Sequence, residues 1–166
     1  MRRLALFLAA MLIAAPAIAR DSLGVFDGWG AFRDPAVPRC YAIAMAQPSS
    51  LAREYQPYAD VGTWPKRALR NQVHLRLSRR VQPGARIVLS ISGRRFDLAG
   101  GGGDAWAADM RMNAAIVAAM RSAASMTVST RDTAGRGFSN TYPLAGAASA
   151  MDAAAVGCAS LRRSPR

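Results

Sequence analysis

The stretch Leu69–Arg80, LRNQVHLRLSRR, alternates apolar and polar side chains with a period of two. The apolar side chains lie on one side of an extended chain, at Val73, Leu75 and Leu77. The polar side chains lie on the opposite side, at Arg70, Gln72, His74, Arg76, Ser78 and Arg80. Because successive side chains of a strand point to opposite faces, this pattern predicts an antiparallel strand with one buried and one solvent-facing side.

The residues after this strand predict an antiparallel meander. Pro83-Gly84 predicts a turn, and Ser92-Gly93 predicts a second, tight one. Strands are expected on both sides of the second turn, with inward side chains at Ile87, Leu89, Ile91, Phe96 and Leu98. Gly100–Gly103 is expected to be a hairpin or a flexible linker, because the Gly-Lys-Ser/Thr of a phosphate-binding loop does not follow it.

The segments before the central strand add two weaker elements. Arg39–Ala46 is predicted to be a strand, and the residues after it form a turn-rich link. Tyr55–Trp64 is predicted to be an irregular or edge strand, because Pro57 and Gly62 interrupt its pattern. At 166 residues, the chain is long enough for one domain with an ordinary core.

The C-terminal part predicts a helix, two strands and a closing helix. Asp109 or Asn113 is expected to cap a short helix through Ser122, with Ile116, Val117 and Met120 on its apolar face. Strands are expected at Ser125–Thr130 and Phe138–Leu144. The closing helix has one face spaced by three or four residues, made by Leu144, Ala148, Met151, Ala155 and Cys158.

Residues 1–19 have the pattern of a secretory signal peptide. Arg2 and Arg3 are followed by the apolar run Leu4–Ala15 and by the small-residue cleavage motif Ala17-Ile18-Ala19. The apolar run is shorter than the roughly 20 residues that a membrane-spanning helix needs, which disfavours the alternative of an uncleaved anchor. We expect a mature chain that starts at Arg20, has no transmembrane segment, and is periplasmic or secreted.

Cys40 and Cys158 are the only cysteines in the chain. In an exported protein they favour one disulfide, with two free buried thiols as the alternative. A catalytic thiol is disfavoured, because the single histidine, His74, lies in a strand pattern and no Cys-x-x-Cys motif is present. His74 has no Asp, Glu or Cys at metal-ligand spacing and is expected to be a surface residue. No catalytic residue, metal or cofactor is therefore predicted.

Positive charge is the most unusual local feature of the sequence. The chain carries 22 Lys and Arg against 10 Asp and Glu, and no acidic residue lies between Asp60 and Asp97. A ladder of guanidinium groups is suited to phosphate or sulfate groups. The candidate polyanion-binding residues on and beside the central strand are Arg70, Arg76, Arg80, Arg86 and Arg94. The alternative, which we favour, is a solvated strand face, since such a face needs polar residues and this chain uses Arg for nearly all of its positive charge.

A series of short motifs occurs in one order along the chain. They are NQV at 71–73, ISGRRFDL at 91–98, DAWA at 104–107, AAMR at 118–121, MTV at 126–128, RG at 136–137, YPLAG at 142–146, and Cys158. This order and spacing resemble the invasion-associated locus B (IalB) family of exported proteins. The resemblance implies an immunoglobulin-like antiparallel β-sandwich with one or two short helices. It divides the chain into a signal peptide (1–19), an N-terminal segment (20–37), the sandwich domain (38–158) and a basic tail (159–166).

Three classes of function follow from these observations. The leading expectation is an exported, non-enzymatic interaction protein whose partner is an unidentified protein or other component of the envelope, with a role in envelope or host-cell association. The alternative is a polyanion-binding protein that recognises a lipid headgroup of lipopolysaccharide or a sulfated, anionic glycan through the arginine-rich strand face. The third class is an enzyme whose site is assembled from residues that the sequence does not group.

Overall fold

The computed structural model describes residues 20–161, so the predicted signal peptide at 1–19 and the tail residues 162–166 lie outside the described residues. From β3 (Arg39–Met45) onward, the strands and helices of the described part follow one another in the order that the sequence predicted. Their bounds are β1 Asp21–Phe26, β2 Trp29–Asp34, β3 Arg39–Met45, β4 Tyr58–Trp64, the 3-10 turn η1 Pro65–Arg67, β5 Leu69–Arg76, β6 Ile87–Ile91, β7 Arg94–Gly101, β8 Asp104–Trp106, α1 Met110–Met120, β9 Ser125–Arg131, β10 Gly137–Pro143 and α2 Ala147–Leu161.

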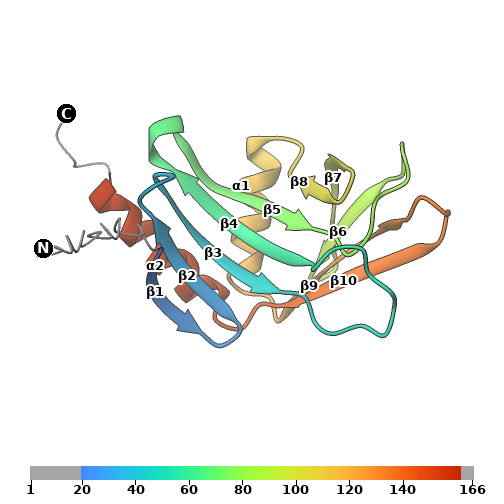
Figure 1. The fold of residues 1–166 in the computed structure, drawn as a ribbon, viewed down its shortest axis with the longest axis horizontal. Coiled ribbons are helices and arrows are strands. Elements are labelled where there is room, and N and C mark those ends of the chain that lie inside the picture. Colours follow the sequence, from blue (N-terminus) through green and yellow to red (C-terminus); the bar gives the residue numbers. More distant parts are fainter. Residues whose placement is uncertain (1–19, 162–166) are drawn as a thin grey trace, which may run out of the picture.

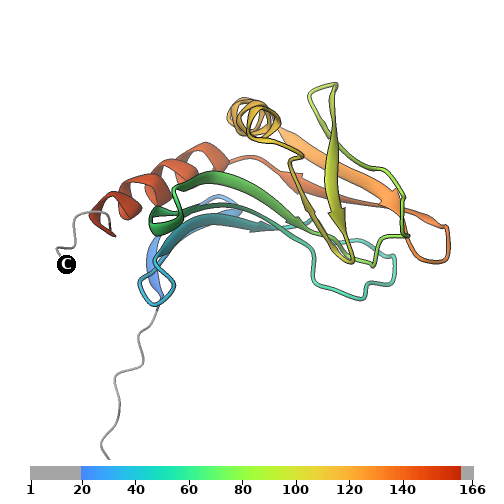
Figure 2. The ribbon, with the colours of Figure 1, turned by 90° about the horizontal axis from the view of Figure 1, so that it is seen from above.

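The strands pair antiparallel in one sheet of order β1-β2-β3-β4-β5-β8-β7-β6-β9-β10. The sheet bends strongly, and the strands around β9 and β10 form a second layer on the side of the sheet that also carries α2 (Figures 1 and 2). β7 and β8 connect the two layers. This mainly antiparallel, sandwich-like arrangement with two helices confirms the predicted fold class.

The core lies between these layers and beneath the helices. The inward side chains predicted from the period of two are buried at Val73, Leu75, Leu77, Ile87, Leu89, Ile91 and Phe96. The predicted apolar face of α1 is buried as well, at Ile116, Val117 and Met120. Tyr142 of β10 is fully buried and donates its hydroxyl to the carbonyl of Arg76, 3.2 Å away, which ties the second layer to β5.

β4 lies in the interior of the sheet, between β3 and β5, so the edge alternative predicted for Tyr55–Trp64 is wrong, whereas the irregular alternative agrees with the register shift between Gly62 and Trp64. Pro57 precedes the strand and removes no hydrogen bond from its ladder. Gly62 is needed because the ring of Trp64 lies over it, where a Cβ atom would clash. A bulge between Gly62 and Trp64 accommodates this packing without ending the strand.

β5 ends at Arg76, four residues earlier than the predicted strand. The chain after Arg76 finds partners outside the ladder: Leu77 donates its N–H to the carbonyl of Gly103, and Ser78 donates to the side chain of Asn140. Ser78 and Arg79 are consequently buried, although the alternation placed Ser78 on the solvent-facing side. The alternation of apolar and polar residues continues beyond Arg76, but the backbone there no longer pairs with β4 and donates to Gly103 and Asn140 instead.

Gly100–Gly103 forms the hairpin between β7 and β8, one of the two predicted alternatives. Gly100 faces the backbone of Asp104 so closely that any side chain there would clash. The N-terminal segment contributes β1 and β2 to the same sheet. Trp29 of β2 is fully buried and donates its indole N–H to the carbonyl of Pro143 at 2.8 Å.

α2 packs across β1–β4 and covers one face of them (Figure 2). Its buried face differs from the predicted one, because Ala155 is exposed and Ala148 is only half-buried. The side chains that are buried are Ala147, Ala150, Met151, Ala154 and Cys158. The helix begins at Ala147 after a left-handed turn at Gly146 (φ +82°), so Leu144 does not set the helical phase.

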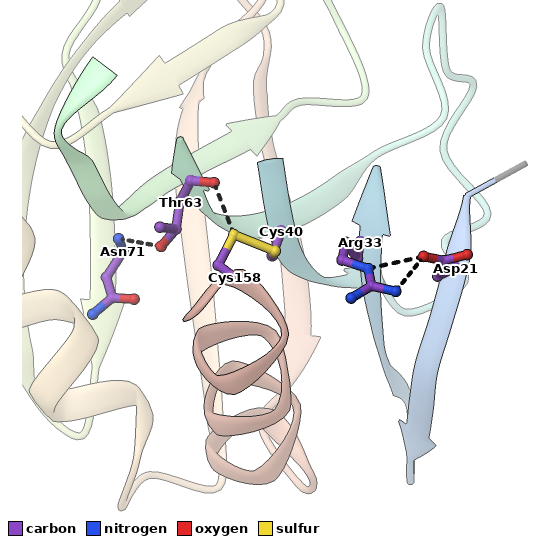
Figure 3. The surroundings of a disulfide bond; sticks show 6 residues. All are labelled: Asp21, Arg33, Cys40, Thr63, Asn71 and Cys158. Carbon is purple, nitrogen blue, oxygen red and sulfur yellow. Dashed lines mark hydrogen bonds and ion pairs between the residues drawn. A yellow bond between two sulfur atoms is a disulfide. The ribbon is translucent and has the colours of Figure 1, made fainter. Parts of the chain in front are cut away.

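The predicted disulfide is present between Cys40 of β3 and Cys158 of α2, with Cα atoms 5.6 Å apart (Figure 3). Both cysteines are buried, and the sulfur of Cys158 also lies 3.7 Å from the carbonyl oxygen of Thr63. The bond therefore fastens the last helix to the middle of the first layer.

Replacing Cys40 and Cys158 together by alanine should lower the free energy of unfolding by about 4–5 kcal/mol, because the bond restricts a long loop of the unfolded chain. Urea unfolding measures this loss, and reduced wild-type protein should unfold at the same urea concentration as the double variant. Thiol titration should find no reactive thiol in the native protein and two after reduction in denaturant. Two reactive thiols in native exported protein would contradict the disulfide.

Candidate functional site

The outer face of β4, β5 and β8 gathers two carboxylates and an aromatic ring around His74. Asp60 of β4 lies directly opposite His74, and Trp106 of β8 lies opposite it on the other side. Asp104, two residues before Trp106, projects from the same face of β8 because side chains of a strand alternate. Register alone therefore brings two carboxylates and an aromatic ring to the single histidine.

The hydrogen bonds of His74 occupy both ring nitrogens. Nδ1 lies 2.8 Å from a carboxylate oxygen of Asp60, and Nε2 lies 3.0 Å from one of Asp104. The Trp106 ring stacks on the imidazole with centroids 5.1 Å apart, and the Tyr58 ring meets it edge-on. The His74 side chain is 16% exposed, so these contacts leave little room for water. Only the imidazolium form, with two N–H donors, satisfies both carboxylates at once.

A second set of contacts closes the cluster on its far side. Asp104 accepts a hydrogen bond from Arg76 with its other carboxylate oxygen. The Arg76 guanidinium stacks over the Tyr55 ring, 3.9 Å from its centroid, and the Tyr55 hydroxyl accepts from Arg80 at 3.5 Å. We call Asp60, His74, Arg76 and Asp104 the His74 cluster. Two carboxylates balance two cations within it.

Burial lowers the pKa of His74, but the hydrogen bonds and negative charges of Asp60 and Asp104 outweigh it and raise the pKa above its ordinary value of 6.5. Burial and the charge of Asp60 also raise the pKa of the Tyr58 hydroxyl. The proton on His74 is therefore held more tightly than on a free imidazole, and the nearest phenol stays neutral.

This arrangement is better suited to holding a fixed charge than to proton transfer. A general base needs a free nitrogen lone pair within reach of a nucleophile, and both His74 nitrogens already face carboxylates. The carboxylates lie on opposite sides of the ring, and the described residues contain no group of three His, Cys, Asp or Glu side chains arranged to hold a metal ion. The His74 cluster is a paired, polar surface flanked by aromatic rings.

His74 is not the isolated residue that the sequence pattern indicated, because Asp60 and Asp104 both pair with it. Asp60 is 14 residues before His74 and Asp104 is 30 residues after it, so no local spacing links them. A strand pairing of β4 with β5 was the one signal available, and it would have placed Asp60 beside His74. The partnership with Asp104 depends on β8 and has no counterpart in the sequence pattern.

The five arginines predicted to form a polyanion site are divided between separate surfaces. Arg70 and Arg76 belong to β5, and Arg80 follows it, but Arg76 and Arg80 are engaged with Asp104 and Tyr55. Arg86 precedes β6, which β8 and β7 separate from β5, and Arg94 belongs to β7, which β8 separates from β5. Arg86 and Arg94 therefore do not lie beside the arginines of β5, although sequence order suggested that they would.

Arg86 instead joins a different group of arginines on the second layer. With Arg95 of β7 and Arg131 of β9, it lines an open hollow of about 680 Å³, and all three side chains are exposed. Arg86 pairs with Asp97 at 2.8 Å, and Arg131 donates to the carbonyl of Gly135. We call Arg86, Arg95 and Arg131 the arginine hollow. Arg94 lies apart, with its guanidinium 5.1 Å from the centroid of the Phe96 ring.

Arg79 is withdrawn from the surface altogether. It is 8% exposed and pairs with the buried carboxylate of Asp132 at 2.9 Å. Asp132 also accepts from the side chain and the backbone of Arg136 and from the backbone of Ala134. Burial raises the pKa of Asp132, but these donors outweigh it and lower the pKa to about 2. This cluster anchors the loop between β9 and β10 and is structural.

Because His74 is the only histidine in the chain, its imidazole proton resonances report its titration directly. NMR should show a pKa above 6.5, and Asp60→Asn and Asp104→Asn should each lower it by removing a carboxylate partner. Asp97→Asn, which removes a carboxylate that pairs with Arg86, is the matched control and should leave the titration unchanged. A His74 titration that neither variant moves would contradict the cluster.

The raised pKa of His74 also gives a direction for stability. A group whose pKa is higher in the folded than in the unfolded state contributes its full stabilisation below the unfolded value, and loses it as pH rises through the folded value. Urea unfolding of His74→Gln should therefore differ from wild type more at about pH 6 than at about pH 9. Arg86→Gln is the control, because it removes an exposed ion pair with Asp97 that contains no histidine. Its difference from wild type in the free energy of unfolding should be the same at both pH values. If pH changes that difference equally for both variants, the raised pKa of His74 is contradicted.

No family model, curated protein or solved structure matches this chain. Within residues 20–161, no helix is long and apolar enough to cross a membrane.

Proposed function

We propose that this chain is an exported, non-enzymatic binding protein that acts in the periplasm or outside the cell. The pattern of residues 1–19 and the pairing of both cysteines in one disulfide support export to an oxidising compartment. Kinship with the IalB family is part of this proposal and rests on the ordered motifs between residues 71 and 158. The partner is a protein or another component of the envelope.

The observation that carries the proposal is the mutual pairing of ionisable side chains on the exposed faces. Both nitrogens of His74 face carboxylates, and Arg76 donates to the second carboxylate oxygen of Asp104. Enzymes place ionisable groups where a substrate can exchange a proton or a charge with them. Here the groups meet each other, which favours a rigid recognition surface over a reaction centre.

A second candidate function is polyanion binding, and the arginine hollow is the observation that favours it. Arg86, just before β6, lies there with Arg95 of β7 and Arg131 of β9, and among residues 20–161 Asp97 is the one carboxylate that pairs with them. Guanidinium groups bind phosphate and sulfate through paired hydrogen bonds, so lipopolysaccharide or a sulfated glycan is the matching ligand class. The arginines of β5 are less suited to this role, since Arg76 is already bound to Asp104.

A salt series separates the two candidates. Binding of the exported protein to lipopolysaccharide vesicles and to heparin is measured for wild type and for Arg86→Ser/Arg95→Ser/Arg131→Ser. If the hollow binds polyanions, affinity falls steeply with salt and the triple variant binds about tenfold or more weakly, because several charge-assisted contacts are lost. Arg53→Ser/Arg67→Ser/Arg111→Ser removes the same charge from exposed positions elsewhere and is the matched control.

Equal losses in both triple variants would identify non-specific attraction to a basic protein and contradict a site at the hollow. Weak binding of lipopolysaccharide and heparin by wild type and by both variants would exclude polyanion binding and leave the proposal of a protein or other envelope partner. Cross-linking in the envelope then tests the leading proposal: a salt-insensitive cross-link to one envelope component supports it, and the absence of any envelope component contradicts it.

A further inference from the structure

A groove lies beside the first half of β5, where β4 pairs with one edge of the strand and no strand pairs with the other. β8 pairs with β5 only at His74–Arg76, so the preceding residues of β5 have no strand on that side. α1 lies there instead, and Asn113 fastens it by donating to the carbonyl of Asn71 at 2.7 Å and accepting from the N–H of Val73 at 2.9 Å. Between the helix and the strand remains a groove of about 570 Å³, within the range of small-molecule sites.

The walls of this groove are largely apolar. On the helix side, the apolar lining residues form one stripe along α1, because three of them lie three or four residues from Ala114: Met110, Val117 and Ala118. On the strand side lie Leu69 and Trp106, which are 40% and 38% exposed. Met110 is 89% exposed, an unusual position for a large apolar side chain. Because the side chains of Ala114 and Ala118 are small, they leave space between the helix and the strand, and this space is the groove.

The charges at the rim of the groove are unequal. Asp109 is the carboxylate at the rim; it caps α1 by accepting from the N–H of Met112 at 2.7 Å, and the positive end of the helix dipole offsets part of its charge. Arg121, at the other end of the helix, is paired with Asp152. Arg70 is exposed and has no hydrogen bond or ion pair with any residue of the described chain. Among the charged side chains at the rim, Arg70 is therefore the cation whose charge no other residue of 20–161 pairs with.

We propose that this groove binds a single-chain anionic amphiphile, with its apolar chain along the alanine stripe of α1 and its head group at Arg70. The apolar walls account for the chain, and the uncompensated guanidinium accounts for the anionic head. The shared chemistry is a carboxylate or phosphate on one alkyl chain, as in a fatty acid or a lysophospholipid. This site is distinct from the arginine hollow on the second layer and does not depend on it.

Calorimetric titration of the protein purified after export tests the ligand class, with every probe below its critical micelle concentration. Dodecanoate and dodecyl phosphate should bind, whereas dodecyltrimethylammonium should bind at least about tenfold more weakly because its charge is repelled by Arg70. Decanoate should bind about tenfold more weakly than dodecanoate, since two methylene groups fewer are buried. Preference for dodecanoate over dodecyl phosphate, or the reverse, separates the fatty-acid from the phosphate source. Equal binding of the cationic probe would overturn the proposal.

Variants locate the site. Ala114→Leu/Ala118→Leu fills the groove at two exposed helical positions and should abolish dodecanoate binding, and Arg70→Gln should weaken it at least about tenfold. The controls are Ser149→Leu on the exposed side of α2 and Arg111→Gln on α1 outside the groove, and both should bind as wild type does. Circular dichroism and urea unfolding confirm that each variant is folded.

Two results would overturn the site. Undiminished dodecanoate binding by the folded Ala114→Leu/Ala118→Leu variant would place the ligand elsewhere. A dimer that this variant dissociates, together with no dodecanoate binding by wild type, would show that the groove is covered by a second copy of the chain. Neither result bears on the salt series, because none of these substitutions touches the arginine hollow.

Discussion

β5 pairs with β8 over only three residues, His74–Arg76, and the character of the outer surface depends on this short pairing. Where β8 is present, its Asp104 and Trp106 lie against β5 and complete the His74 cluster. Where β8 is absent, the edge of β5 is left to α1, whose Asn113 makes hydrogen bonds that a neighbouring strand would have made. One short hairpin thus divides a single strand between a closed polar surface and an open apolar groove.

The positive charge of the chain is used in two different ways. Some arginines are structural: Arg79 is buried against Asp132, and Arg76 is held between Asp104 and Tyr55. Others stay exposed, and three of them converge on the arginine hollow of the second layer. Structural pairs of this kind cost desolvation and offer no charge to a ligand, so a count of basic residues overstates the binding surface. The exposed arginines are the ones whose charge remains accessible from solvent.

Much of the fold could be predicted from the sequence, because its signals are local. Alternation identified the buried side chains of β5, β6 and β7, and Asp109 caps α1 as one of two predicted residues. The pairing of Cys40 with Cys158 followed from there being no other cysteine. The errors arose where neighbours override local pattern: β4 keeps its ladder despite Gly62, and β5 ends while its alternation continues. Residues 20–37 carried no strand prediction, yet they form β1 and β2.

The sequence by itself determined which side chains are buried, where several strands turn, which cysteines are joined and that the surface is basic. Only the tertiary structure decided which polar residues meet. Asp60 and Asp104 reach His74 through two separate strand pairings, and Arg86 is parted from Arg76 by two inserted strands. The physical reason is that burial repeats every two residues along a single strand, whereas the partner of an exposed side chain depends on which strand lies next to it. Strand order is set by contacts between distant parts of the chain, and no local spacing records it.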